Sequence, residues 1–553
     1  MVAGEMGVKK ELALSPPVSP AAPSPSIVLP HHLHHTTPGP KGHAYKEITD
    51  EPIDEEEFWT NMGKLHNIGL CLVYALVGFV PSFVSTPLSV YLVHTLNAHP
   101  VIQNQISICM SLPWALKVFL GFTSDALPLC GERRRPYIFL GTLSWAGFFL
   151  YLSYVGNPSG PILGLCLCLS TVGMVLCDTI SDAMIVERST MECEEDHGHL
   201  QSLVYAVRFG AAVVGAVLGG LVYNEWSFRM TFAEIMCLAG ALPLVLLLPS
   251  LGFVKDMRRP RSSSVVVAAA GDGAIVSVGE GVEEIEGHPP VSQQLRQIWD
   301  TVTLRVVFQP MAFVFMYNLF QVPNVSWNSF LQLTLGFTPL MLGALSFGGR
   351  LMTFVGILIY KRYFLRSSWR AVYVFSTVLL ALLSVLQLLL IFQINTYFGI
   401  SNFLFSLGDD VMSAFITGMQ FLPLTIVYMK LCPGGSEGAT YSMLTTFSNL
   451  ALILGNSVGS LFSLIWDVSN GAMRRSDLSG LWKLTVLTSC LSPLPLVLLF
   501  LLPSDREQEK QMRSRAGASK WAGMLFLATL AGSLAWIIGQ GIYVLCNQNL
   551  NRG

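Results

Sequence analysis

The sequence has few charged residues: Asp, Glu, Lys and Arg make up 12% of its 553 residues. A soluble domain carries roughly 25%, so this chain lacks the charge needed to cover a soluble surface. Its net charge of −2 provides no basic excess for binding nucleic acid. The hydrophobic content of 52% instead indicates a polytopic membrane protein.

The sequence also lacks the motifs of several other protein classes. Its 11 cysteines show no paired spacing and lie mostly in apolar runs, which excludes a disulfide framework and a zinc site. It has no nucleophile elbow, phosphate-binding loop or HExxH motif, so we predict neither an enzyme nor a cofactor. The Gly-rich segment GDGAIVSVGEG follows no strand, and we interpret it as flexible chain.

Residues 1–66 lack the apolar content to fold, and we predict that they form a disordered cytoplasmic tail. The first apolar stretch begins near residue 67, so we expect no N-terminal signal peptide. The tail contains a group of histidines that could hold a metal, but such clusters in polar tails are often incidental, and we predict no metal site. These histidines are His31, His32, His34 and His35.

Thirteen stretches are apolar over the roughly 20 residues that a spanning helix requires. They predict a six-helix half at 67–250, a cytoplasmic linker at 251–302 and a second six-helix half at 303–503. A basic cytoplasmic segment at 504–520 then precedes a thirteenth transmembrane helix at 521–546. The predicted spans are 67–94, 101–126, 137–156, 161–187, 202–224, 229–250, 303–333, 339–361, 371–393, 400–430, 438–466, 481–502 and 521–546.

Lys and Arg gather in the loops that follow even-numbered helices, beginning with Arg133–Arg135. Loops after odd-numbered helices are short and nearly free of basic residues, with Arg229, Arg474 and Arg475 as exceptions. Because cytoplasmic loops carry the excess of Lys and Arg, the N-terminal tail and the even loops are predicted to be cytoplasmic. The thirteenth helix would then place the C-terminus on the other side.

Polar residues inside the spans avoid the third helix of each triplet, which is nearly apolar throughout. Two six-helix halves with polar residues on the other helices indicate a repeat transporter with a central cavity. Some of the interior charges are expected to be structural pairs, because buried ions need partners. The polar residues are Lys117, Asp178, Asp182, Arg208, Asn318, Gln321, Asn324, Asn328, Arg350, Asp409, Asp410, Asn449 and Asn456.

Depth along the helices suggests which charges meet. Asp178 and Asp182 are four residues apart and share a helix face, and an Asp182–Arg208 pair is geometrically plausible. Asp178 lies one turn deeper, nearer the midplane. Asp409 and Asp410 are adjacent and point in different directions, and Arg350 is their expected partner.

The segment GFTSDALPLCGERRRPY resembles the loop signature between helices 2 and 3 of the major facilitator superfamily. Its wider context PWALKVFLGFTSDALPLCGERRRPYIFLG, with CDTISDAMIVERS and QSLVYAVRFGA, resembles the folate–biopterin transporter family over about residues 60–505. The resemblance implies an all-α, major-facilitator-type bundle of six plus six helices, to which this chain adds a C-terminal transmembrane helix. It also implies uptake of folates, pterins and related metabolites by a secondary transporter.

The residues fit that chemistry. The amino-pyrimidine edge of a pterin can bond a carboxylate such as Asp178, and the anionic glutamate tail suits Lys117, Arg208 or Arg350. The predicted substrate-binding residues are Lys117, Asp178, Arg208, Asn318, Trp327, Arg350 and Asp410.

A second group of residues is predicted to couple and gate transport. The arginines of the following loop would reach Asp125, or Glu187 across the half, and form a latch. Asp178 would couple transport to protons, or instead only hold a basic residue in place or bond the pterin edge. The alternative for Lys117 is a salt bridge to Asp178 or Asp182. The predicted coupling and gating residues are Asp125, Arg134, Arg135, Asp178, Asp182, Glu187 and Asp409.

Two other functions remain open at this point. One is transport of a different metabolite, such as S-adenosylmethionine or an amino acid, and the other is a non-transporting receptor or scaffold. The dense interior charge argues against a scaffold. The predicted partners are a small-molecule substrate, protons and the lipid bilayer, and the plasma membrane is favoured over an organelle membrane.

Overall fold

The computed structural model describes residues 65–127, 129, 132, 134–189, 199–224, 228–254, 296, 299–364, 367–431, 437–504, 508 and 517–546. Within these ranges the chain is helical, and its β-pairing consists of two isolated bridges. The predicted tail up to residue 64 and most of the predicted segments 251–302 and 504–520 lie outside the described residues.

Each predicted span of the first half corresponds to a helix or a pair of consecutive helices. Their lengths suit a bilayer because a helix rises 1.5 Å per residue. The elements are α2 (Leu65–Val90), η1 (Tyr91–Thr95), α3 (Pro100–Ala115), α4 (Lys117–Ala126), α5 (Arg135–Val155), α6 (Gly160–Ser189), α7 (His199–Val222) and α8 (Phe232–Ser250).

The second half follows the same plan, with short helices in its connections, and the thirteenth span forms α20. The elements are α10 (Arg305–Phe320), α11 (Trp327–Ser329), η2 (Phe330–Thr334), α12 (Pro339–Ile359), η3 (Tyr360–Phe364), α13 (Trp369–Ile391), α14 (Ile394–Tyr397), α15 (Asn402–Leu431), α16 (Glu437–Phe462), α17 (Asn470–Arg474), α18 (Ser479–Leu491), η4 (Leu494–Leu501) and α20 (Lys520–Cys546).

Two predicted spans are broken, which corrects the sequence prediction of continuous helices at 101–126 and 303–333. The first breaks at Leu116, whose N–H bonds to the carbonyl of Pro113, three residues back. The second ends at Phe320 and resumes at Trp327. Pro323 explains this second break, because proline lacks the N–H that continues a helix and disfavours helical geometry in the residue before it.

By length and hydropathy alone, nine helices within the described ranges qualify as membrane spans. Most of the remaining predicted spans fall short because they are interrupted, as in α3–α4 and α10–α11, or carry polar residues. Asp409 in α15 and Asn449 in α16 are examples. Polar residues and irregular backbone at membrane depth are tolerated where they face protein or a cavity.

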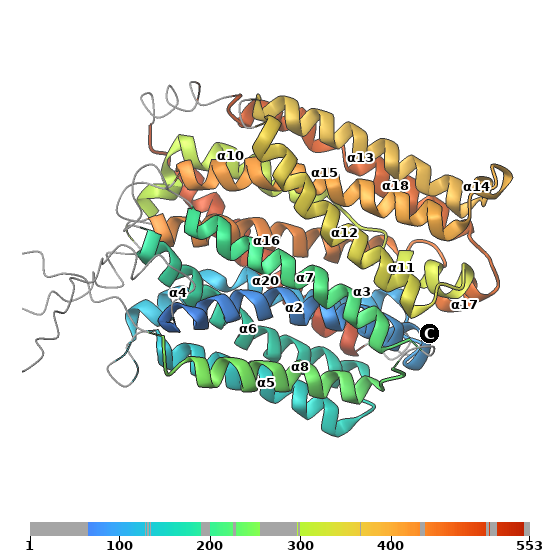
Figure 1. Cartoon of the computed structure of the whole chain (residues 1–553). Coiled ribbons are helices and arrows are strands. Elements are labelled where there is room, and N and C mark those ends of the chain that lie inside the picture. The colour runs from blue at the N-terminus through green and yellow to red at the C-terminus, as the bar shows by residue number, and fades with distance from the viewer. Residues whose placement is uncertain are drawn as a thin grey trace, which may run out of the picture. The chain divides into compact units, whose positions relative to one another are not determined.

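The third helix of each triplet lies at the edge of the bundle. Figure 1 shows α5 and α8 along one edge and α13 and α18 along the opposite edge. The halves meet in the middle, where α7 packs against α12 and α3 packs against α16. A Cβ atom added at Gly220 would lie 2.7 Å from the Cα of Gly343, so α7 and α12 cross backbone to backbone.

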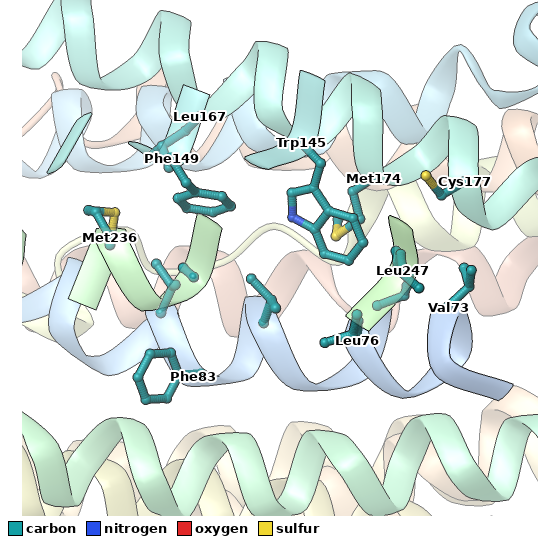
Figure 2. Packing of buried hydrophobic residues seen from close by; sticks show 14 of the residues in the cluster. Val73, Leu76, Phe83, Trp145, Phe149, Leu167, Met174, Cys177, Met236 and Leu247 are labelled. Carbon is teal, nitrogen blue, oxygen red and sulfur yellow. The ribbon is translucent and has the colours of Figure 1, made fainter. Parts of the chain in front are cut away.

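The first half is built around a continuous apolar core. Figure 2 shows Trp145 and Phe149 of α5 pointing toward the helices that carry Leu76 and Met236. Trp145 is 1% exposed, and its cluster joins residues of α2, α5, α6, α7 and α8. This packing supplies a rigid wall for the polar residues described next.

The thirteenth helix contacts both halves, because α20 packs on α16 and α3. The Nε1 of Trp536 donates to the Oγ of Ser457 at 3.1 Å, and the Nε2 of Gln540 donates to the carbonyl of Ser457 at 3.1 Å. The helix therefore covers the line along which α3 and α16 meet.

Candidate functional site

A cavity of about 730 Å³ lies between the two halves. The first half contributes lining residues from α2 to α7, and the second half contributes them from α12, α15 and α16. The polar lining residues are Ser82, Ser107, Ser111, Trp114, Lys117, Ser170, Thr171, Asp182, Tyr205, Arg208, Arg350, Thr445, Ser448, Asn449 and Asn456.

One wall of the cavity holds the first-half charge cluster, which consists of Tyr74, Lys117, Asp178, Asp182 and Arg208. The Nζ of Lys117 donates to Asp178 Oδ2 at 2.7 Å and also to Asp182. The Nη1 of Arg208 donates to Asp178 Oδ1 at 3.0 Å. Tyr74 Oη donates to Asp182 Oδ1 at 2.5 Å. Two cations thus face two carboxylates, and the cluster has no net charge.

Local structure explains how these groups meet. Asp178 and Asp182 are one turn apart on α6, so their carboxylates share a face. Lys117 is the first residue of α4, directly after the break at Leu116. The Trp114 ring lies below both cations, with its centroid 5.7 Å from Lys117 Nζ and 5.4 Å from Arg208 Cζ. Such contacts add cation–π attraction to the ion pairs.

The observed pairing differs from the expected Asp182–Arg208 pair. Arg208 bonds Asp178 instead, while Asp182 is occupied by Tyr74 and Lys117. Lys117 makes the salt bridges that were weighed as the alternative to a substrate-anion role. Asp178 is fully buried beneath the cavity wall, in the region where depth counting had placed it, and its bridge to Lys117 is one of the two weighed from the sequence.

The second half presents its charges separately. Arg350 of α12 lines the cavity and is exposed to it, and it forms no ion pair with any described residue. Its expected partners lie elsewhere on α15. Asp409 Oδ2 accepts a hydrogen bond from Gln387 Nε2 at 2.9 Å, and Asp410 is half-buried and absent from the cavity lining.

Two other residues predicted to bind substrate lie outside this lining. Asn318 Nδ2 donates to Ser448 Oγ at 2.7 Å, so it supports a lining residue from behind. Trp327 packs on Phe330 with ring centroids 5.4 Å apart. In this conformation both residues therefore stabilise the second half.

The predicted latch is described only in part. The side chains of Asp125 and Glu187, together with all of Arg133, lie outside the described residues. Arg134 is buried and donates to Ser124 Oγ at 3.3 Å. Arg135 donates to the carbonyl of Leu251 at 3.0 Å, which ties the loop before α5 to the end of α8.

Sequence reasoning missed several residues around the cavity. Tyr74 had no signal, because a single tyrosine in an apolar span is ordinary. Phe209 and Phe421 come from opposite halves, and their ring centroids lie 6.4 Å apart at the cavity. Asn456, noted only as a polar residue in its span, lines the cavity, and its carbonyl accepts from Asn104 Nδ2 at 2.7 Å.

Hydrogen bonds join the halves at the end of the bundle where α2 finishes and α3 begins. Gln103 Nε2 donates to Ser329 Oγ at 3.0 Å, and Asn470 Nδ2 donates to the carbonyl of Ala98 at 2.9 Å. Gln332 Nε2 donates to Ser89 Oγ at 2.9 Å. The halves are therefore in direct contact on this side of the cavity.

Similar curated proteins cover most of the chain. A Synechocystis protein named folate-biopterin transporter is 28% identical over 423 residues, which span 76% of this chain and 78% of that protein. Folate transporter 1 of Plasmodium falciparum is 22% identical, and the match spans 77% of each chain. A probable folate-biopterin transporter 4 of Arabidopsis thaliana is 25% identical over 79% of this chain and 95% of its own.

Solved structures share the fold at low sequence identity. A D-xylose-proton symporter matches with a TM-score of 0.54 and 12% identity, over 80% of this chain and 97% of that chain. A bacterial homologue of the lysosomal transporter Spinster, in an inward-facing and occupied conformation, matches with a TM-score of 0.51 over 80% and 97%. These likenesses confirm the all-α, major-facilitator-type fold and the multi-pass membrane protein predicted from the sequence.

The family model described as the BT1 family matches residues 78–521. The match includes the cavity lining except Val77, the first-half charge cluster except Tyr74, and the start of α20. Together with the folate–biopterin transporters among its relatives, it confirms the family resemblance found in the sequence and supports a role in membrane transport. The chain belongs to the BT1 family.

Proposed function

We propose that this protein is a secondary transporter that moves folate or pterin compounds across a membrane by alternating access, coupled to protons. The observation that carries the proposal is the position of Arg350, a cation without an ion pair among the described residues, on a cavity between two six-helix halves. Relatives named as folate or folate–biopterin transporters supply the substrate class.

Electrostatics favour an anionic substrate. The first-half charge cluster is neutral as a whole, so Arg350 leaves the cavity with a net positive charge. A cation away from bulk water gains most from a carboxylate, which a guanidinium binds in a bidentate manner. The glutamate tail of a folate provides such carboxylates, and we assign it to Arg350.

The flat ring of the substrate has aromatic neighbours in the same cavity. Trp114 and Tyr205 line it from the first half, and Phe209 and Phe421 approach each other across the two halves. Offset stacking on such rings contributes beyond the burial of area. The cavity volume of about 730 Å³ lies within the roughly 300–1,000 Å³ typical of ligand pockets.

Alternating access requires contacts between the halves that break and re-form. The hydrogen bonds of Gln103, Gln332 and Asn470 are the natural candidates at one end of the cavity. The backbone crossing of Gly220 and Gly343 provides a place where the halves can rock. We place the protein in the plasma membrane, with its N-terminus cytoplasmic.

The test is uptake of radiolabelled folate by a folate-auxotrophic host that expresses the protein, measured at two external pH values. We expect uptake that rises at the lower pH and is competed by biopterin. Unlabelled S-adenosylmethionine and amino acids serve as competitors in the same assay. Strong competition by either of these, with none by pterins, would replace the folate proposal with one for that metabolite.

A receptor or scaffold would bind without net transport. Folate accumulation above the external concentration therefore separates the proposed function from that alternative. An Arg350→Ala variant that reaches the membrane in wild-type amounts and takes up folate normally would contradict the assigned role of Arg350.

A further inference from the structure

A second polar group lies inside the second half, away from the cavity. Asp409 is 6% exposed, and its Oδ2 accepts the hydrogen bond from Gln387. Its Oδ1 is buried and has no hydrogen-bond partner in the described part of the chain. The buried Oγ of Ser406, three residues earlier on the same face of α15, also lacks a partner among the described residues.

No described cation neutralises this carboxyl. α15 packs against α12, α13, α14, α16 and η3, and Arg350 of α12 faces the cavity and forms no ion pair with it. Asp410 is the neighbouring acid on α15 itself. The other described titratable groups on these elements are Arg370 and Tyr373 of α13, Tyr397 of α14, and Tyr360, Arg362 and Tyr363 of η3.

Most of these groups lie far from Asp409 along the bundle. Tyr373 is on the second turn of α13, 14 residues before Gln387, which corresponds to about 21 Å along a helix. η3 directly follows α12, at the end of the bundle away from the start of α15, where Asp409 lies. Tyr397 is 88% exposed. Asp409 is therefore a buried carboxyl with a neutral amide as its only described partner.

An ionised carboxylate at this position is unfavourable, because burial removes its hydration. Among the described groups only the Gln387 amide replaces that hydration, and no cation does. A proton on Oδ1 removes the charge and turns this oxygen into a donor, and a hydroxyl such as that of Ser406 is an acceptor of the right kind. We propose that the carboxyl of Asp409 binds the transported proton at a site in the second half that is separate from the substrate cavity. This inference rests on the proposed function.

Asp178 is less suited to the same task. Both of its oxygens are bound by cations, so adding a proton would require breaking an ion pair with Lys117 or Arg208. Asp409 Oδ1 can gain and lose a proton without breaking any described ion pair. In each cycle it takes one proton from water on one side of the membrane and returns it to water on the other.

Backbone contacts connect this site to the cavity. A Cβ atom at Gly418 of α15 would lie 2.2 Å from the carbonyl oxygen of Thr353 on α12, and one at Gly356 would lie 2.3 Å from that of Phe415. α12 also carries Arg350. A shift of α15 on protonation would therefore move α12 and with it Arg350, which is assigned to bind the substrate. Proton binding and substrate binding would then affect each other reciprocally.

The experiment uses the purified full-length protein in proteoliposomes. Exchange of labelled folate is measured without a gradient, and accumulation is measured under an imposed pH gradient and, separately, an imposed Na⁺ gradient. The variants are Asp409→Asn, Asp178→Asn and Ser406→Ala, with Asp467→Asn as the removal of an exposed carboxyl outside the proposed sites. Infrared difference spectra between two pH values report protonation of buried carboxyls without any substrate.

We expect Asp409→Asn to keep exchange, lose pH-driven accumulation and lose a carboxylic acid band from the infrared difference spectrum. Asp467→Asn should keep that band and keep the ratio of driven accumulation to exchange, because the Asp467 side chain is 60% exposed. Ser406→Ala should retain coupling with a shifted pH midpoint, which covers the case in which Asp409→Asn folds poorly.

Three results would overturn the inference: full pH-driven accumulation by Asp409→Asn, loss of coupling only in Asp178→Asn, or wild-type accumulation driven by Na⁺ alone. A wild-type protein that exchanges no folate or pterin would instead contradict the proposed function. In that case the infrared band still decides whether Asp409 takes up a proton.

Discussion

In the first half, two carboxylates bind two cations and a tyrosine within one cluster on the cavity wall. In the second half, Arg350 faces the cavity without an ion pair to any residue that the structure describes, and Asp409 is buried beside a neutral amide. The same residue types thus occur in opposite situations. Charges that neutralise each other hold helices in place, whereas charges without partners are available to a substrate or a proton.

This difference assigns separate tasks to the halves. The first-half charge cluster joins α4, α6 and α7 and presents a neutral wall. In the proposed mechanism, the second half supplies the cation that selects an anion and the carboxyl that takes a proton. Variants that remove one charged residue from either half test this difference.

The largest effect is expected from Asp178→Ala. Removing one partner of a buried ion pair typically costs about 3–5 kcal/mol, and here both Lys117 and Arg208 would lose a carboxylate. We expect a strong fall in the thermal stability of the detergent-purified protein. Asp182→Ala is the matched control. We expect a smaller fall in its thermal stability, because the Asp182 side chain is 23% exposed and water can partly replace the lost carboxylate. A stable Asp178→Ala protein that exchanges substrate without accumulating it would make Asp178 the coupling residue, as predicted from the sequence.

A smaller effect, on affinity and not on stability, is expected from Arg350→Ala. A hydrogen bond to a charged group contributes about 1.5–3 kcal/mol, equivalent to roughly a 10- to 150-fold loss of folate affinity. Neutral biopterin should be affected much less, because it has no glutamate tail. Inhibition constants for folate and biopterin, measured against the same labelled substrate in wild type and variant, give the loss of affinity for each compound. Equal losses for both would contradict an anion-binding role.

Arg475→Ala serves as the control for Arg350→Ala. Arg475 is exposed, and its contact with Asp467 is 3.9 Å long, so its removal should leave both inhibition constants unchanged.

An intermediate effect, on the equilibrium between conformations, is expected from Asn470→Ala, which removes a hydrogen bond between the halves. The bond to the carbonyl of Ala98 is buried, and its loss should cost the observed conformation about 1 kcal/mol, or roughly fivefold in the conformational equilibrium. Access of a membrane-impermeant thiol reagent to a cysteine introduced at Ser107, a cavity-lining position, would measure it. Unchanged labelling would show that this bond does not hold the halves together.

The smallest effect is expected from Asp125→Asn at the predicted latch. The sequence places this latch at the cytoplasmic end of its helix. An ion pair at such a place contributes up to about 1 kcal/mol, so transport should slow by up to roughly fivefold with little change in KM. A comparable fall in affinity would contradict a latch. Arg135→Gln is a useful comparison, because Arg135 bonds the carbonyl of Leu251 and its loss should also loosen the end of α8.

The sequence selected several residues that the structure places in or beside the cavity, but it left their pairing open. Lys117, Asp178, Arg208 and Arg350 could be selected because charges in membrane spans are rare and costly. The sequence offered salt bridges from Lys117 to Asp178 or Asp182 and a pair of Arg208 with Asp182. It could not choose among them, because counting residues gives depth along a helix but not its rotation. The break at Leu116 adds to this difficulty, since it changes the direction in which Lys117 projects.

Composition and the length of the apolar runs were by themselves enough to determine an all-α membrane bundle of two six-helix halves with a further C-terminal helix. The hydrophobic effect and the need to satisfy backbone hydrogen bonds in lipid act on every residue of a span. Each span can therefore be recognised in the sequence as a long apolar run. The arrangement of the helices was needed to show that Asp178 binds both Lys117 and Arg208, while Arg350 and Asp409 form no ion pair with a described residue. Such pairings depend on ångström-scale approach between helices far apart in sequence, and packing sets that approach.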